Sequence, residues 1–251
     1  MRRSALSGVV VVAWLACSPR AQAGRTSHLL AREAQIVPEG DVEVEQWLWG
    51  EGRVPNRPSR PVLEWLWWAP VVGVSPHLEL AFPLELSGSD ALSLKNIGID
   101  ARYRLFPREQ DEGLQPLIRV GYSHPLSEYG GAPRLELDLV AEYGAPSAVQ
   151  LTVNLGGSWA LPFLAPSSGA ADFFLTSAAG VSAPLPFGLR LGAEVFNRAP
   201  LTAPAGTADV LYAGASVAWA HGPFWITVGS LFGLTGNSPR VFPKVLWAVE
   251  L

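Results

Sequence analysis

Cysteine, lysine and long apolar runs are all scarce in this 251-residue chain, although 49% of its residues are hydrophobic. The one cysteine, Cys17, lies near the N-terminus, so a chain processed beyond it has no disulfide or thiolate metal site. Lysine occurs only at Lys95 and Lys244, and arginine therefore carries most of the positive charge. After residue 23, no run approaches the roughly 18 apolar residues of a membrane-spanning helix.

The first 23 residues resemble a secretory signal peptide that is cleaved on export. Arg2 and Arg3 form a basic start, residues 8–16 (GVVVVAWLA) form a short apolar core, and residues 21–23 (AQA) fit a small-x-small cleavage site. A lipoprotein signal with Cys17 as the acylated residue is an alternative, but an aromatic residue stands where such a signal has an aliphatic one.

Charge and export together narrow the class of protein. Removing residues 1–23 takes away Arg2, Arg3 and Arg20 and no acid, so the formal net charge changes from −4 to −7. A negative chain of this kind is not expected to bind nucleic acid. High apolar content, export and the lack of a spanning helix leave a large secreted β protein or an outer-membrane barrel.

Alternation of apolar and polar residues dominates the sequence from residue 41 onward. Residues 24–40 show no sustained period, and we expect them to form a periplasmic leader or a partial plug. Residues 41–251 consist of segments with period 2, separated by Gly, Pro, Ser and Asn, which indicates successive β-strands and turns. The twelve predicted strands lie near residues 41–50, 61–73, 77–87, 94–106, 116–126, 134–144, 148–160, 171–184, 188–198, 208–220, 223–232 and 241–251.

Three features favour a membrane barrel over a soluble β-sandwich. The strands have the length that a tilted strand needs to cross a bilayer. Short turns alternate with longer loops, apart from a long periplasmic connection at 107–115. Aromatic residues gather near strand ends, as at a membrane–water interface. We therefore predict an all-β fold, a twelve-stranded antiparallel up-and-down transmembrane β-barrel over residues 41–251, in the bacterial outer membrane. The predicted interface aromatics are Trp47, Trp49, Trp65, Trp67, Trp68, Trp159, Trp219 and Trp247.

Several of these segments also carry a recognisable pattern. The first strand (DVEVEQWLW) is acidic, a turn before L-E-L follows at 74–86, and residues 98–105 (GIDARYRL) and 121–125 (GYSHP) read G-x-x-x-x-Y-R-L and G-x-S-x-P. Over about residues 39–126 the chain resembles a loose family of transporter-like bacterial outer-membrane barrels, including barrels named for phenol-degradation pathways. The resemblance implies a fold and a location more than an activity. Such barrels usually end on an aromatic residue that the barrel-assembly machinery recognises, whereas this chain ends on Leu251.

The polar faces of the predicted strands carry charges of both signs. These faces are expected to line the lumen, because an Arg or Lys facing lipid at the bilayer midplane costs roughly 2–4 kcal/mol. Opposed arginines and carboxylates could form a pore constriction that selects small solutes. They could equally form ion pairs that fill a narrow lumen without conducting. The candidate lumen-lining residues are Glu79, Glu85, Asp100, Arg102, Arg104, Arg119, Glu136, Asp138, Glu142, Arg190, Glu194 and Lys244.

A porin-like or transporter-like channel is thus the leading prediction, with two alternatives. One is a non-conducting structural or interaction barrel, whose loop 51–60 carries three arginines that could contact lipopolysaccharide phosphates or simply face solvent. The other is an outer-membrane lipid hydrolase, which needs a Ser–His pair. Ser123 and His124 are adjacent on a strand and point to opposite faces, so we expect no catalytic residue and no enzyme.

No cofactor or metal motif is present in the sequence. No glycine-rich loop lies between a strand and a helix, and no His/Asp/Glu cluster has ligand spacing. The expected partners are outer-membrane lipids, lipopolysaccharide, the barrel-assembly machinery and small solutes.

Overall fold

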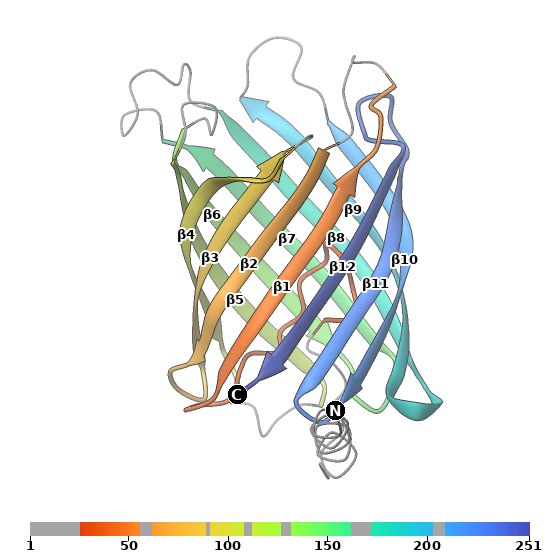
Figure 1. Cartoon of the computed structure of the whole chain (residues 1–251). Coiled ribbons are helices and arrows are strands. Elements are labelled where there is room, and N and C mark those ends of the chain that lie inside the picture. Colours follow the sequence, from red (N-terminus) through yellow and green to blue (C-terminus); the bar gives the residue numbers. More distant parts are fainter. Residues whose placement is uncertain are drawn as a thin grey trace, which may run out of the picture.

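The chain forms one closed, antiparallel barrel in which each strand pairs with its neighbours in sequence and β1 pairs with β12 (Figure 1). This computed structural model describes residues 26–55, 62–88, 91–107, 112–126, 132–161, 172–202 and 209–251. The strands are β1 (Val42–Glu51), β2 (Val62–Gly73), β3 (Leu78–Gly88), β4 (Ser93–Arg104), β5 (Leu114–Pro125), β6 (Arg134–Tyr143), β7 (Gln150–Ala160), β8 (Phe173–Leu185), β9 (Leu189–Thr202), β10 (Val210–His221), β11 (Phe224–Gly233) and β12 (Val241–Glu250). The predicted all-β fold with twelve strands is confirmed.

The strands are 10 to 14 residues long and tilt around the barrel (Figure 1). Closure leaves no strand edge, so the backbone polar groups of every strand can pair with a neighbour. The pairing of β2 with β3 shifts between Trp68 and Val71, where Pro70 cannot donate to the ladder. β9 continues to Thr202, four residues beyond its predicted end, because Thr202 and Pro200 still pair with β8.

The outer face of the barrel is apolar. On β6 and β7 the outward side chains include Leu139, which is 50% exposed, and Val153, which is 56% exposed. A soluble protein rarely exposes a continuous apolar surface of this extent, and such a band is the surface of a barrel that spans a bilayer. Within the described residues, no helix is long and apolar enough to cross a membrane.

Connections at the two ends of the barrel differ. The end that holds the C-terminus, drawn at the bottom of Figure 1 and here called the lower end, carries the β2–β3, β6–β7, β8–β9 and β10–β11 turns and the longer β4–β5 connection between Arg104 and Leu114. His221 pairs with Phe224 around a two-residue turn in which Gly222 adopts a φ of 58°, a conformation that glycine adopts without strain. The opposite, upper end carries the β1–β2, β3–β4, β5–β6, β7–β8, β9–β10 and β11–β12 connections.

Candidate functional site

The inner wall of the barrel carries charged side chains on most strands and is largely apolar on β10, β11 and β12, apart from Lys244. The twelve ionisable residues assigned to the lumen from the sequence all lie on the inner face of their strands, and Glu79, Asp100, Arg119, Glu194 and Lys244 are among the eight that are buried. Across the barrel, Tyr212, Trp225, Leu231, Phe242 and Leu246 form an apolar wall on β10, β11 and β12. The interior therefore offers both charge and apolar surface.

Arg119 on β5 joins acids of its two neighbouring strands, β4 and β6, near the middle of the barrel. Its guanidinium lies 2.5 Å from Asp100 Oδ2, and 2.8 Å from both Glu136 Oε2 and Asp138 Oδ2. The Arg119 side chain is only 6% exposed. A buried cation with three carboxylates around it is held by charge-assisted contacts, and we expect it to brace β4, β5 and β6 rather than to meet a solute.

Residues 26–37 run through the lower part of the lumen (Figure 1). Glu194 accepts hydrogen bonds from three successive backbone amides, those of Leu29 (2.5 Å), Leu30 (2.9 Å) and Ala31 (2.7 Å). Glu142 accepts from the amide of Ala34. Barrel carboxylates therefore bind the backbone of this segment.

Further contacts hold the same segment from other strands. Glu79 accepts from the amide of Val37 at 2.7 Å, and Arg102 donates to the carbonyl of Glu33 at 2.7 Å. Lys244 donates to the carbonyl of Leu29 at 2.7 Å. Six of the lumen residues assigned from the sequence thus contact residues 26–37, counting Asp138, which pairs with Arg32 (3.2 Å).

The barrel wall is shaped to receive this segment. A Cβ on Gly180 would lie 2.5 Å from Nε2 of His28, and a Cβ on Gly192 would lie 2.6 Å from the carbonyl oxygen of Ser27. Glycine at these two positions therefore leaves the room that the segment occupies. Apolar contacts complete the fit, since Leu29 packs into the apolar wall and Ile36 packs against inward residues of β5 and β6.

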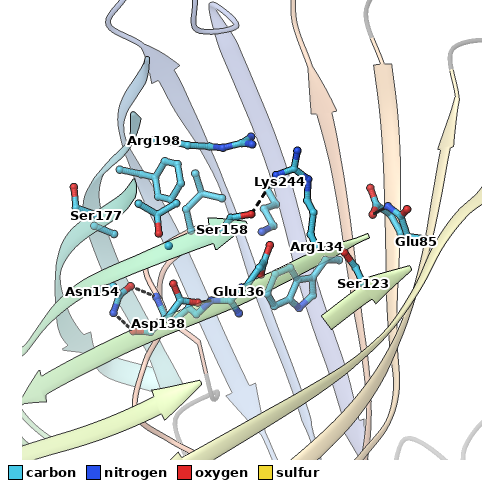
Figure 2. A pocket seen from close by; sticks show the side chains of 18 of the residues that line it. Glu85, Ser123, Arg134, Glu136, Asp138, Asn154, Ser158, Ser177, Arg198 and Lys244 are labelled. Atoms are coloured by element: carbon cyan, nitrogen blue, oxygen red, sulfur yellow. Dashed lines mark hydrogen bonds and ion pairs between the residues drawn. The ribbon is translucent and has the colours of Figure 1, made fainter. Parts of the chain in front are cut away.

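Above residues 26–37 lies a cavity of about 420 Å³ (Figure 2). Arg134, Arg198 and Lys244 extend toward it from different strands, with Glu136 and Asp138 on the same wall in Figure 2. A volume of this order suits a small organic molecule. The residues that line the cavity are Leu30, Arg32, Trp47, Glu85, Lys95, Asn96, Ser123, Ala132, Arg134, Glu136, Asp138, Asn154, Gly157, Ser158, Thr176, Ser177, Ala178, Phe196, Arg198 and Lys244.

Four cavity-lining cations are absent from the lumen residues assigned from the sequence. Lys95 occupies a register shift between β3 and β4 and forms ion pairs with Glu85 (3.0 Å) and Glu64 (3.1 Å). A bulge of this kind redirects a side chain that strict alternation would place outside. Arg32 lies in the non-periodic segment, whereas Arg134 and Arg198 lie at predicted strand ends and share the parity of the inward residues of β6 and β9.

The aromatic residues divide between the two faces. Trp67 is 41% exposed and Trp219 is 37% exposed, both outward, and Trp159 stacks on Phe173 near the upper end at a centroid distance of 4.6 Å. Trp65 and Trp247 share the outward parity of their strands, whereas the side chain of Trp68 lies outside the described residues.

The predicted positions of Trp47 and Trp49 were wrong. Both were predicted at the membrane interface, but they lie on the inner face, where the Lys244 ammonium sits 4.1 Å from the ring centroid of Trp47. Trp49 stacks on Phe242, part of the apolar inner wall. Both lie on the same face of β1 as Glu43 and Glu45, which are buried inside the barrel, so the acidic residues of β1 indicate the face of its tryptophans.

The Ser123–His124 pair does not form. Ser123 lines the cavity, whereas His124 lies beside Tyr122 on the outer side, with the Tyr122 hydroxyl 3.2 Å from Nδ1. Among the described residues, no group of three or more His, Cys, Asp or Glu side chains could hold a metal ion.

The fold of the chain is similar to that of known outer-membrane barrels. The sequence matches no protein-family model and no curated protein sequence. The structure is similar to an outer-membrane channel from Pseudomonas putida F1, with a TM-score of 0.62 and 9% identity, over 89% of this chain and 100% of that one. It is also similar to the NanC porin, with a TM-score of 0.56 and 8% identity, over 83% of this chain and 98% of that one. At these identities the likeness shows a shared barrel fold, which agrees with the architecture that the sequence resemblance implied.

Proposed function

We propose that this chain is a porin-like channel of the bacterial outer membrane that admits small solutes through a charged lumen. The observation that carries the proposal is the cavity of about 420 Å³, lined by charged and apolar side chains inside a barrel with an apolar exterior. The two channel-like barrels of similar fold support the same function. The lumen residues assigned from the sequence have two roles in this proposal: those above line the solute path, and those below hold residues 26–37.

Residues 26–37 act in this proposal as a plug that restricts the lower half of the path. Hydrogen bonds from side chains of at least five strands hold it in the lumen. The segment itself is not one of the paired strands of the barrel. Passage then depends on how often this segment leaves its place, which is a local opening rather than unfolding of the barrel.

A non-conducting barrel is the second candidate, and the same plug favours it. If residues 26–37 never leave the lumen, the barrel would present only its upper surface and loops. The loop at 51–60 offers Arg53 to lipopolysaccharide phosphates, whereas Arg57 and Arg60 lie outside the described residues. The export signal over residues 1–23, also outside the described residues, and insertion by the barrel-assembly machinery are part of either proposal.

Current recording in planar lipid bilayers tests the channel proposal. Purified protein, refolded in detergent and shown to have heat-modifiable mobility, is inserted into planar lipid bilayers. The channel proposal predicts discrete current steps, with ion selectivity that changes on Arg198→Gln and not on Arg240→Gln, since Arg240 is exposed and does not line the cavity. Folded protein that stays silent at all voltages would instead support the non-conducting barrel.

A further inference from the structure

The cavity above the plug holds cations and acids that are not balanced against each other. Its described lining has five basic residues and three acidic ones. Each lining acid has a cation as an ion-pair partner: Glu85 pairs with Lys95, and both Glu136 and Asp138 pair with Arg119. Every lining carboxylate therefore already contacts a cation of the protein.

The five lining cations differ in whether they form ion pairs. Lys95 and Arg32 pair with carboxylates, and Arg134 pairs with Asp172 at 3.0 Å. Arg198 and Lys244 form no ion pair within 4.0 Å with any described acid. The acids Glu136, Asp172 and Glu51 are near enough to Arg198 to interact with it through space, but none reaches its guanidinium.

The Arg198 guanidinium is held in place by an aromatic ring. Its Cζ lies 3.9 Å from the ring centroid of Phe174, and Arg134 Cζ lies 5.6 Å from the same centroid. Stacking of this kind leaves the N–H edge of a guanidinium free to donate. Figure 2 shows Arg198 and Arg134 reaching toward the same space from opposite sides.

Apolar surface lies next to these cations. Leu30, Trp47, Ala178 and Phe196 line the same cavity. Lys244 contributes its ammonium at the floor, above the ring of Trp47 and bonded to the plug carbonyl of Leu29. A ligand that fits this arrangement has one anionic group and an apolar body.

We propose that the cavity binds organic monocarboxylates, with the carboxylate accepting hydrogen bonds from Arg198 and Arg134 and the apolar body lying against Trp47 and Phe196. Planar donors of arginine match the two oxygens of a carboxylate. This inference rests on the proposed function, because it names the class of solute that the channel takes.

The experiment compares three probes of one size on the full refolded chain: hexanoate, hexanamide and hexylammonium, titrated by calorimetry below their micellar concentrations. Hexanoate is expected to bind at least about tenfold more tightly than either other probe, as a charged hydrogen bond is worth roughly 1.5–3 kcal/mol and 1.4 kcal/mol is tenfold in affinity. Arg198→Gln should lower hexanoate affinity by about tenfold or more, Arg198→Lys should lower it less, and Arg240→Gln should match the wild type.

Equal binding of hexylammonium and hexanoate, no binding of any probe, or equal affinity of the Arg198→Gln and Arg240→Gln variants would overturn the inference. The probe series on the wild-type chain decides the charge preference even where a variant does not fold. Current steps without hexanoate binding would contradict the inference and leave the channel intact. Hexanoate binding with silent bilayers would contradict the channel alone.

Discussion

In the lower half of the barrel, Glu79, Glu142 and Glu194 accept hydrogen bonds from backbone amides of residues 29–37, whereas in the upper half the charged side chains border an open cavity. Both halves use the same kinds of residue on the same strands. The difference is the ligand: below, it is the chain's own backbone, and above, space remains for a solute.

A charged lumen is therefore not by itself evidence that a barrel conducts ions or solutes. A carboxylate can accept hydrogen bonds from a backbone amide as well as from a solute cation. An ammonium can likewise donate to a backbone carbonyl or to a solute anion. Lys244 stands at the boundary, since it donates to the plug and also lines the cavity.

The largest expected effect is on the free energy of unfolding and comes from removing Arg119, whose ion pairs lie between the two halves of the lumen. Arg119→Met leaves Asp100 buried without its cation, and removing one member of a buried ion pair costs about 3–5 kcal/mol. We expect the free energy of unfolding, measured by urea titration in detergent or lipid, to fall by that amount. Arg240→Met, at an exposed position, is the control and should unfold like the wild type. Equal stability of the two variants would contradict a bracing role.

A smaller effect separates plug binding from cavity lining. Glu194→Gln removes the charge that three plug amides share, and a hydrogen bond to a charged group contributes roughly 1.5–3 kcal/mol. Hydrogen exchange at residues 29–31 should then quicken by about ten- to a hundredfold. The matched change Glu85→Gln removes an acid of the upper cavity and should leave these amides protected. Quickening by both variants would mean that the halves are not independent.

Gly180→Ala tests the fit of the plug against β8. The added Cβ would lie 2.5 Å from the His28 ring, so the ring must shift and the plug should be held less tightly. We expect a modest rise in the open probability of single channels with little change in barrel stability. A control is Ala179→Gly, on the neighbouring outward position of the same strand. An open probability unchanged by Gly180→Ala would argue that residues 26–28 do not limit passage.

The smallest expected effect depends on pH. Burial disfavours the charged form of His28, but the hydrogen bond to Glu33 at 2.8 Å and the charges of Glu33 and Glu194 outweigh it and raise the pKa of His28 above 6.5. A raised pKa means that the stabilisation is complete below pH 6.5 and is lost as the pH rises through the raised value. The protection factors of residues 27–33, which are corrected for the base-catalysed intrinsic exchange of each amide, should therefore fall at higher pH. His28→Gln should remove this dependence, and a pH dependence that survives in it would assign the effect to another group.

Much of the barrel could be predicted from the sequence because lipid contact enforces a period of 2 on every strand. The strand positions and the inward face of residues such as Asp100 and Glu136 follow from that alternation alone. On β10–β12 both faces are largely apolar, and there only the positions of polar residues such as Lys244 indicate the inner face.

The parts that could not be predicted break that period. Lys95 enters the lumen through a register shift, and no local signal marks it. Trp47 was assigned by residue type rather than by its place in the alternation of β1. Residues 26–37 have no period, because their partners are wall carboxylates far away in the sequence, such as Glu194.

The most direct test of the plug is the single-channel conductance of a chain from which residues 26–37 are deleted. The deletion keeps the barrel strands intact and removes the backbone groups that the wall carboxylates bind, together with the side chains of Leu29, Arg32 and Ile36. If the plug limits passage, the protein is folded and heat-modifiable and its conductance is several-fold larger than that of the wild type. Equal conductance of the two folded proteins would contradict a plug that limits passage.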